Sequence, residues 1–329
     1  MHTANNNDGD TSMRLTKKLS LFAAAAAITA STAVLAAPTF INVLTGGTSG
    51  VYYPIGVALS QLYSNGIEGS KTSVQATKAS VENLNLLEAG RGELAFALGD
   101  SVADAWNGVE DAGFKAPLKK IRAIAGTYPN YIQIVANAES GIKTLEDLKG
   151  KRISVGAPKS GTELNARAIF EAAGLTYKDM GKVEFLPYAE SVELIKNRQL
   201  DATLQSSGLG MAAIRDLAST MKISFVAIPA EVTAKIDNAA YEAATIPAGT
   251  YDGQDADVPT VAINNILVTH EGVSDEVAYQ MTKLMFDNLG RLGTAHSAAQ
   301  DIKLETATQN LPIPLHPGAE RFYKEAGAL

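Results

Sequence analysis

The chain contains one short structural pattern twice, and the two copies are 111 positions apart. Each copy has a strand-like run, at 40–44 or 152–156, followed by a loop rich in small residues and a helical pattern. Serines 31 residues apart mark the same two places in both copies: Ser49 and Ser80 in the first, Ser160 and Ser191 in the second. The equal spacing predicts two similar α/β lobes and favours a ligand held between them.

Strand-like and helix-like segments alternate between residues 40 and 228, which is typical of parallel α/β sheets. Helices are expected at 81–89 and 163–173, each followed by a glycine that can end it. The residues at 142–149 predict a short helix, and those at 274–289 a long one. At 329 residues, the chain is long enough for two lobes of ordinary domain size.

Two apolar, β-prone runs are candidates for strands that cross between the lobes. The run at 131–136 would lead into the second lobe, and the run at 261–269 would return to the first. These crossings predict a discontinuous first lobe, residues 37–131 plus 263–329, and a second lobe at 132–262. A hinge of two strands would permit closure around a ligand.

The N-terminus has the pattern of a secretory signal peptide. Arg14, Lys17 and Lys18 precede an apolar run at 19–35, and the run ends in small residues. This pattern is too short and too rich in alanine for a membrane span. We therefore expect export, with residues 1–36 removed by cleavage near Ala36.

Composition restricts the class of protein further. The chain has no cysteine, which excludes disulfides, a thiolate nucleophile, cysteine-ligated zinc and a lipid anchor on cysteine. No later segment is long and apolar enough to insert in a membrane, so a soluble periplasmic protein is expected. The formal charge of −7 and the absence of a basic run make nucleic acid an unsuitable partner.

The starts of the expected helices carry the main signal for binding. Ser160 and Glu163 fit a capping box, and Ser80 and Ser191 stand where helix N-caps are expected. A helix N-terminus exposes unpaired N–H groups and a partial positive charge, which suit an anion. Taken singly, each serine is better explained as an ordinary helix cap, so it is several such loops coming together that indicate binding.

Small polar residues follow several of the expected strands. In parallel sheets such loops gather at the carboxyl ends of the strands, where ligands bind. Their neutral donors suit a carboxylate, and Tyr52 or Tyr53 could add a ring with a hydroxyl. The candidate loops contain Thr48 and Ser49, Asp100 and Ser101, Ser160 and Thr162, and Gln205, Ser206 and Ser207.

Catalytic and metal-binding patterns are weak. The histidines lack ligand spacing, and His316 fits a turn better than a general base. The Gly-rich loop lacks a P-loop lysine, and no Gly-x-Ser-x-Gly elbow occurs. The acidic cluster at 252–257 misses EF-hand spacing, and Arg167 fits a surface ion pair. We predict no catalytic residues, no metal and no cofactor.

Several motifs, in one order along the chain, resemble the TAXI family of solute receptors of TRAP transporters. They are the run from Leu44 to Gly56, the run from Asp147 to Arg152 with Ser160 to Glu163, the run from Ile246 to Tyr251, and the run from Pro314 to Ala319. This resemblance covers essentially the whole chain after the signal peptide. It implies a two-lobed type II periplasmic binding protein fold, of the Venus-flytrap kind, without enzymatic activity.

The resemblance also implies a ligand, a partner and site residues. The ligand would be a small carboxylate such as glutamate or 2-oxoglutarate, and the partner the integral membrane subunits of a TRAP transporter driven by an ion gradient. The site residues it implies are Thr48, Ser49, Tyr52, Ser160, Gly161 and Thr162, with Ser80, Asn83, Gln205 and Ser206 as weaker correspondences. Gly99 replaces a glutamine common in relatives, ahead of Asp100 and Ser101.

We therefore predict an exported receptor that binds a small organic anion between two lobes and delivers it to a membrane transporter. A periplasmic enzyme on the same two-lobed scaffold is one alternative, although it would need a nucleophile or a base in the cleft. A sensor that signals to a membrane kinase is another, because the sequence does not distinguish sensing from transport.

Overall fold

A computed structural model describes residues 38–329, the unit Pro38–Leu329. The predicted signal peptide, residues 1–36 with cleavage near Ala36, lies outside the described residues. Among the helices of residues 38–329, none combines the length and the apolar character that a bilayer crossing requires.

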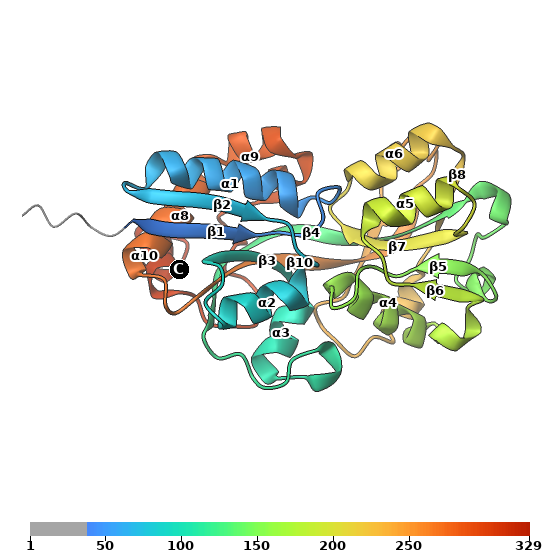
Figure 1. Cartoon of the computed structure of the whole chain (residues 1–329), viewed down its shortest axis with the longest axis horizontal. Helices are drawn as coiled ribbons and strands as arrows, with labels where there is room; N and C mark the ends of the chain where they lie inside the picture. Colours follow the sequence, from blue (N-terminus) through green and yellow to red (C-terminus); the bar gives the residue numbers. More distant parts are fainter. Residues whose placement is uncertain (1–37) are drawn as a thin grey trace, which may run out of the picture. The chain divides into compact units, whose positions relative to one another are not determined.

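A ten-stranded sheet forms the centre of this unit, and helices cover both of its faces (Figure 1). The strands are β1 (Thr39–Leu44), β2 (Ser70–Gln75), β3 (Leu94–Leu98), β4 (Ile121–Asn137), β5 (Arg152–Ser154), β6 (Lys182–Glu184), β7 (Ala202–Ser207), β8 (Ile223–Val226), β9 (Glu242–Ile246) and β10 (Val258–His270). The helices are α1 (Tyr52–Gly66), α2 (Ser80–Glu88), α3 (Gly99–Asn107), α4 (Gly161–Ala172), α5 (Tyr188–Lys196), α6 (Ala212–Thr220), α7 (Ala230–Thr233), α8 (Asp275–Asp287), α9 (Leu289–Ala295) and α10 (Pro317–Glu325).

This sheet contains two sets of parallel strands that run in opposite directions. The strand order is β2-β1-β3-β10-β4-β7-β5-β6, in which β1 to β3 are mutually parallel and β5 to β7 likewise. Between the sets, β10 is antiparallel to β3 and to β4, and β4 is antiparallel to β7. The carboxyl ends of the two sets therefore face each other.

The long strands β4 and β10 connect the two sets. The first part of β4, up to Tyr131, pairs with β10, and its part from Tyr131 to Ala136 pairs with β7. The predicted crossing run at 131–136 is thus the second part of a longer strand, and the run at 261–269 lies within β10. The division into lobes at 131/132 and 262/263 remains a prediction.

Helices cover both faces of each strand set. Figure 1 shows α1 and α9 on one face of β1–β3 and α2 and α3 on the other; α5 and α6 lie opposite α4 around β5–β7. Every residue of β3, Leu94–Leu98, is buried. A strand that is apolar along its whole length needs cover on both faces, which explains why β3 lacks the alternation of a half-exposed strand.

The predicted helices at 81–89, 163–173 and 274–289 are confirmed as α2, α4 and α8. The helix predicted at 142–149 is wrong, because only one 3₁₀ turn, Glu146–Leu148, forms there. The carboxylate of Asp147 accepts the N–H groups of Lys143 and Thr144 at 3.0 and 2.9 Å. This local cap turns the chain before a regular helix begins.

Candidate functional site

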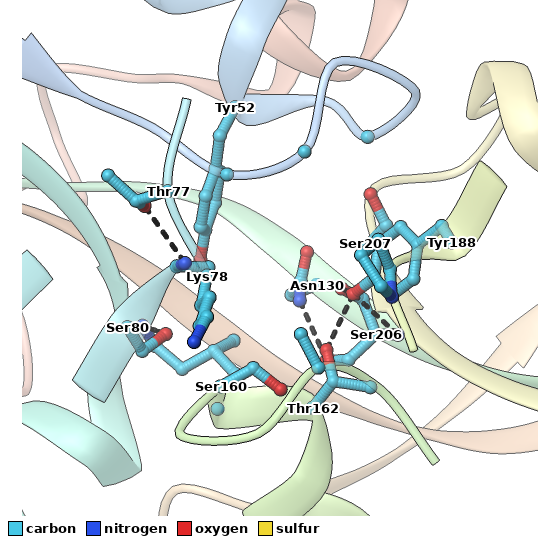
Figure 2. Close-up of a pocket in the computed structure, with 18 of the residues that line it drawn as sticks. Tyr52, Thr77, Lys78, Ser80, Asn130, Ser160, Thr162, Tyr188, Ser206 and Ser207 are labelled. Carbon is cyan, nitrogen blue, oxygen red and sulfur yellow. Dashed lines mark hydrogen bonds between the residues drawn. The ribbon is translucent and has the colours of Figure 1, made fainter. Parts of the chain in front are cut away.

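A cavity of about 120 Å³ lies where the carboxyl ends of the two strand sets meet (Figure 2). All six parallel strands supply part of its wall, through their last residues or the segments that follow them, and β4 supplies Asn130. The residues of the wall are Gly46, Gly47, Gly50, Val51, Tyr52, Thr77, Lys78, Ala79, Ser80, Leu98, Asn130, Ala157, Ser160, Gly161, Thr162, Pro187, Tyr188, Ser206 and Ser207. Six of the twelve predicted site residues are among them.

The Gly-rich loop after β1 presents its glycines to the cavity. Gly46, Gly47 and Gly50 are part of the wall, and the Gly50 N–H donates to the Gly47 carbonyl over 3.1 Å. Thr48 is exposed and Ser49 half-buried, and neither belongs to the wall. The turn that brings the glycines to the cavity carries these two predicted site residues away from it.

Tyr52 begins α1 and contributes to the wall, whereas Tyr53 does not. The Tyr52 ring stacks on Phe96 with centroids 5.0 Å apart, and its hydroxyl donates to Asn265 Oδ1 over 2.5 Å. Burial, and then the neighbouring Tyr188, raise the pKa of Tyr52 well above its ordinary value. The hydroxyl of Tyr52 therefore stays protonated at neutral pH.

The segment after β2 enters α2 through a strained residue. Ala79 has φ of 70° and ψ of −145°, a conformation that costs a non-glycine residue on the order of 1–3 kcal/mol and is typical of functional sites. Ala79, not Ser80, holds the predicted N-cap position. The Ser80 hydroxyl instead accepts the Leu98 N–H over 3.1 Å, which ties α2 to the end of β3.

Lys78 brings the only full positive charge to the cavity wall. Its side chain forms no salt bridge with any residue in the range 38–329, although its backbone N–H binds the Glu82 carboxylate at 2.6 Å. Lys78 is exposed, so water solvates the ammonium group in the absence of a ligand. In the view of Figure 2, Lys78 lies on the same side as Ser80 and Ser160.

The start of α4 contributes unpaired N–H groups. Ser160 is the N-cap and accepts the Glu163 N–H over 3.2 Å, as the sequence predicts. The second half of the predicted capping box is wrong, because the Glu163 carboxylate binds Arg167 at 2.7 and 2.6 Å. Gly161 and Thr162 occupy the first helical positions, where N–H groups have no partner within the helix.

A chain of hydrogen bonds leads from the wall to a buried carboxylate. Asn130 donates to Ser206 Oγ over 2.8 Å, and Ser206 donates to Asn165 Oδ1 over 2.9 Å. Asn165 and Tyr241 both donate to Asp100 Oδ2 over 2.7 Å. Burial raises the pKa of Asp100, whereas its hydrogen bonds act in the opposite direction. Asp100, a predicted site residue, thus lies behind the wall.

Three more predicted site residues have places in the fold outside the wall. The Asn83 amide donates to backbone carbonyls after β1 and within β3, at 2.7 and 2.8 Å. The Ser101 N–H donates to Asp100 Oδ1 over 2.6 Å. Gln205 is fully buried, and because neighbouring strand residues point to opposite faces, it points away from the face that Ser206 occupies.

Sequence reasoning missed Lys78, Asn130 and Tyr188. Ser191, predicted as an N-cap, lies inside α5, where its hydroxyl donates to the Pro187 carbonyl over 3.0 Å. The helix begins three residues earlier, at Tyr188, and this residue faces the cavity. The sequence carries no signal for Lys78, or for Asn130 in the middle of β4, because neither stands out among the hydroxyl-bearing residues of the loops at strand ends.

The structure places His316 at a turn, as the sequence indicates. It caps α10: Nδ1 accepts the Gly318 N–H over 3.2 Å, and Nε2 lies 2.9 Å from the Val273 carbonyl. Burial lowers the pKa of His316, so the ring is neutral at physiological pH. Within residues 38–329, no three His, Asp or Glu side chains come close enough to hold a metal ion.

Two opposed sets of parallel strands, two long connecting strands and a cavity between the strand ends define the class of protein. The fold is that of the type II periplasmic binding proteins, as predicted. The chain belongs to the NMT1-like family, whose sequence profile matches residues 43–327.

Solved structures share this fold at low sequence identity. One is the PhnD1 protein of Prochlorococcus marinus in complex with methylphosphonate, with 11% identity over 89% of this chain and 100% of that chain and a TM-score of 0.55. Another is the binding protein component of an ABC phosphonate transporter from Pseudomonas aeruginosa, with 12% identity over 81% of this chain and 80% of that chain and a TM-score of 0.50. At such identities the likeness establishes the fold.

Proposed function

We propose that this protein is an extracytoplasmic receptor that binds a small organic anion between its strand sets and delivers it to a membrane transporter. The observation that carries the proposal is the position of Lys78, a lysine without a salt bridge within the described part of the chain, in the wall of a cavity at the strand ends. A ligand with one negative charge would pair with this ammonium group.

The start of α4 adds to the positive potential at the cavity. The N–H groups of Gly161 and Thr162 and the N-terminal end of the helix dipole favour an anion. The Ser160 hydroxyl accepts a hydrogen bond from its own helix and keeps its proton for a ligand. Together with Lys78, these groups provide charge-assisted hydrogen bonds, which are stronger than neutral ones.

The volume of the cavity restricts the size of the ligand. An engineered cavity of about 150 Å³ in another protein holds benzene, which has six non-hydrogen atoms, so about 120 Å³ suits a ligand of roughly four to seven. A small carboxylate is our first candidate. Glutamate and 2-oxoglutarate, the ligands that the TAXI resemblance implies, lie above this range. Because PhnD1 binds methylphosphonate, sulfonates and phosphonates are the second anionic class to test.

The proposed partner of the receptor is a membrane transporter. The TAXI-like motifs favour the membrane subunits of a TRAP transporter, with the receptor exported to the periplasm. The Pseudomonas aeruginosa neighbour serves an ABC transporter, which is the rival partner. Ligand uptake into vesicles that carry one transporter or the other distinguishes the two partners. A TRAP transporter requires an ion gradient, whereas an ABC transporter requires ATP.

We expect small monocarboxylates to raise the melting temperature of the protein, because a ligand that binds only the folded state stabilises it by mass action. The protein is first unfolded and refolded to remove bound ligand, then melted with carboxylates, sulfonates, phosphonates, amino acids and sugars. Stabilisation by sugars alone would contradict anion binding. Recovery of the ligand chemically unchanged after incubation tests the further proposal that the protein is not an enzyme.

Lys78→Met is expected to weaken binding of the best acid about tenfold or more, since a hydrogen bond to a charged group contributes about 1.5–3 kcal/mol. Isothermal calorimetry measures the change. Lys71→Met is the matched control: Lys71 is an exposed residue on β2, 5.9 Å from the Phe40 ring centroid, and does not belong to the wall. Equal affinities for the two variants would remove Lys78 from the site.

A further inference from the structure

The hydrogen bonds around the cavity have a direction, which decides where a ligand meets donors and where it meets acceptors. A hydroxyl has one proton, so a hydroxyl that donates to a protein acceptor offers a ligand only its lone pairs. A side-chain amide has an oxygen on one side and an NH₂ group on the other, and its partners determine its orientation.

The Thr162 hydroxyl faces the cavity as an acceptor. Tyr188 Oη lies 2.7 Å from the Ser206 carbonyl oxygen, which can only accept, so Tyr188 donates its proton there. Tyr188 also accepts the Ser206 N–H over 3.2 Å. The Thr162 hydroxyl, 2.5 Å from Tyr188 Oη, must therefore donate to Tyr188. Because Thr162 is only 5% exposed, its lone pairs have few partners besides a ligand.

Asp100 sets the direction at Ser206. The Asp100 carboxylate accepts from Asn165 Nδ2, so Asn165 turns its oxygen to Ser206, and the Ser206 hydroxyl donates to it. Asn130 Nδ2 donates to Ser206 Oγ, and its orientation is fixed by Asn265, whose Nδ2 lies 3.4 Å from Asn130 Oδ1. One lone pair of Ser206 and one N–H of Asn130 remain available in the cavity wall.

The side of the cavity with Lys78 has the opposite character. The Ser160 hydroxyl accepts a backbone N–H group, so its proton remains available to a ligand, whereas the Ser80 hydroxyl accepts the Leu98 N–H and also hydrogen-bonds Tyr52. Figure 2 shows Lys78, Ser80 and Ser160 on one side and Asn130, Thr162 and Ser206 on the other. One side thus offers donors and a positive charge. The other offers the lone pairs of Thr162 and Ser206, together with the spare N–H of Asn130 and the proton of Ser207, whose hydroxyl accepts the Val51 N–H.

We propose that the ligand is a short hydroxy acid whose anionic group binds at Lys78 and whose hydroxyl binds at Thr162 and Ser206. This inference rests on the proposed function, because it requires an anion in the cavity. A hydroxyl donates to one of the two lone-pair acceptors and accepts the spare N–H of Asn130. Buried polar groups on this side of the wall then have partners, as stability requires.

Other polar groups fit the acceptor side less well. A keto oxygen can only accept, so the oxygens of Thr162 and Ser206 would face it without a proton between them. A second carboxylate in the same place would also face the oxygens of Thr162 and Ser206 without a proton between them, and it would add a negative charge. An ammonium group would leave the Asn130 N–H unpaired, and the wall contains no carboxylate to balance its charge.

The test in the native sequence uses pairs of acids that differ in one group. Isothermal calorimetry on the refolded full-length protein compares lactate with pyruvate and propionate, 3-hydroxybutyrate with acetoacetate and butyrate, and 2-hydroxyethanesulfonate with ethanesulfonate. Malonate, succinate and β-alanine represent a second carboxylate and an ammonium group. The hydroxy acid is expected to bind about tenfold more tightly than its partners, because it alone satisfies both donor and acceptors.

Asp100→Asn is expected to reverse the direction of the hydrogen bonds that run from Ser206 through Asn165 to residue 100. The Ser101 N–H faces Oδ1 and cannot change direction, so the new NH₂ group must take the Oδ2 position and donate to Asn165. Asn165 then turns its NH₂ group to Ser206, and the Ser206 proton is released into the cavity. The ratio of hydroxy-acid to keto-acid affinity is expected to fall about tenfold in this variant.

Two further variants complete the experiment. Asp104→Asn makes the same change one turn along α3, at a half-buried residue outside the wall, and should leave the ratio unchanged. Ser206→Ala removes one acceptor and should reduce the ratio even if Asp100→Asn does not fold. An unchanged ratio in Asp100→Asn, or tighter binding of a keto acid, diacid or β-alanine to the native sequence, overturns the hydroxy-acid inference but leaves anion binding intact. If none of the acids binds, the proposed function itself fails.

Discussion

Replacement of Gly161 with valine is expected to weaken anion binding by about 100-fold or more, close to 2.7 kcal/mol, while the protein remains folded. A Cβ atom at Gly161 would lie 2.7 Å from Leu98 Cδ1 and 2.7 Å from Ser80 Oγ. Carbon atoms in good contact are about 3.5–4.0 Å apart, so either the side chains of Leu98 and Ser80 must rotate from their places in the cavity wall or the start of α4 must move away from α2 and β3. An anion would then lose its contacts with one side of the cavity.

Calorimetry with the best acid measures this effect, and thermal melting shows whether the variant is folded. Gly290→Val is the matched control, because Gly290 is exposed on α9 and a Cβ there would meet no atom within 4 Å. An unchanged affinity in Gly161→Val would mean that binding does not require α4 to approach α2 this closely.

The main features of the fold could be predicted because they follow from local patterns. The spacing of the two copies predicts two similar α/β lobes with a ligand between them, and the glycines at 90 and 174 predict where two helices end. The exact extent of β4 could not be predicted, because its first part, Ile121–Tyr131, is held by pairing with β10, which lies more than 130 residues later. The failed helix at 142–149 depends on the side chain of Asp147, a local competitor that periodicity does not register.

The site could be predicted only in part, and the reason is physical. The sequence identifies loops at strand ends, but the backbone turn decides which residues of a loop face inward, so Thr48 and Ser49 lie outside the wall while their neighbouring glycines line it. Asp100 comes shortly after β3, which makes it a candidate by its place in the sequence. In the structure Asn165, a residue of the second copy of the pattern, links the Asp100 carboxylate to Ser206 of the wall, so Asp100 lies behind the wall. Only the assembled structure shows such a contact.

Gly318→Val is expected to destabilise the protein by about 3 kcal/mol or more and lower Tm by about 6 °C or more, without changing the affinity of the folded protein for its ligand. Gly318 lies in the first turn of α10, where His316 is the cap. A Cβ there would collide with the Asp275 carbonyl oxygen and lie 2.8 Å from the Tyr279 backbone nitrogen. Both atoms belong to the backbone of α8, so rotation of a side chain cannot relieve the overlap.

Thermal melting and urea denaturation measure the loss, and Gly290→Val again serves as the control, since it adds the same side chain to a helix where space is open. The difference between the two variants isolates the contact of α10 with α8 from the helix propensity of valine, which is a few tenths of a kcal/mol more favourable than that of glycine. Equal melting temperatures would show that α10 can move away from α8 at little cost. In that case the Pro317–Gly318–Ala319 motif would need an explanation other than close helix packing, which is the role that the structure supports.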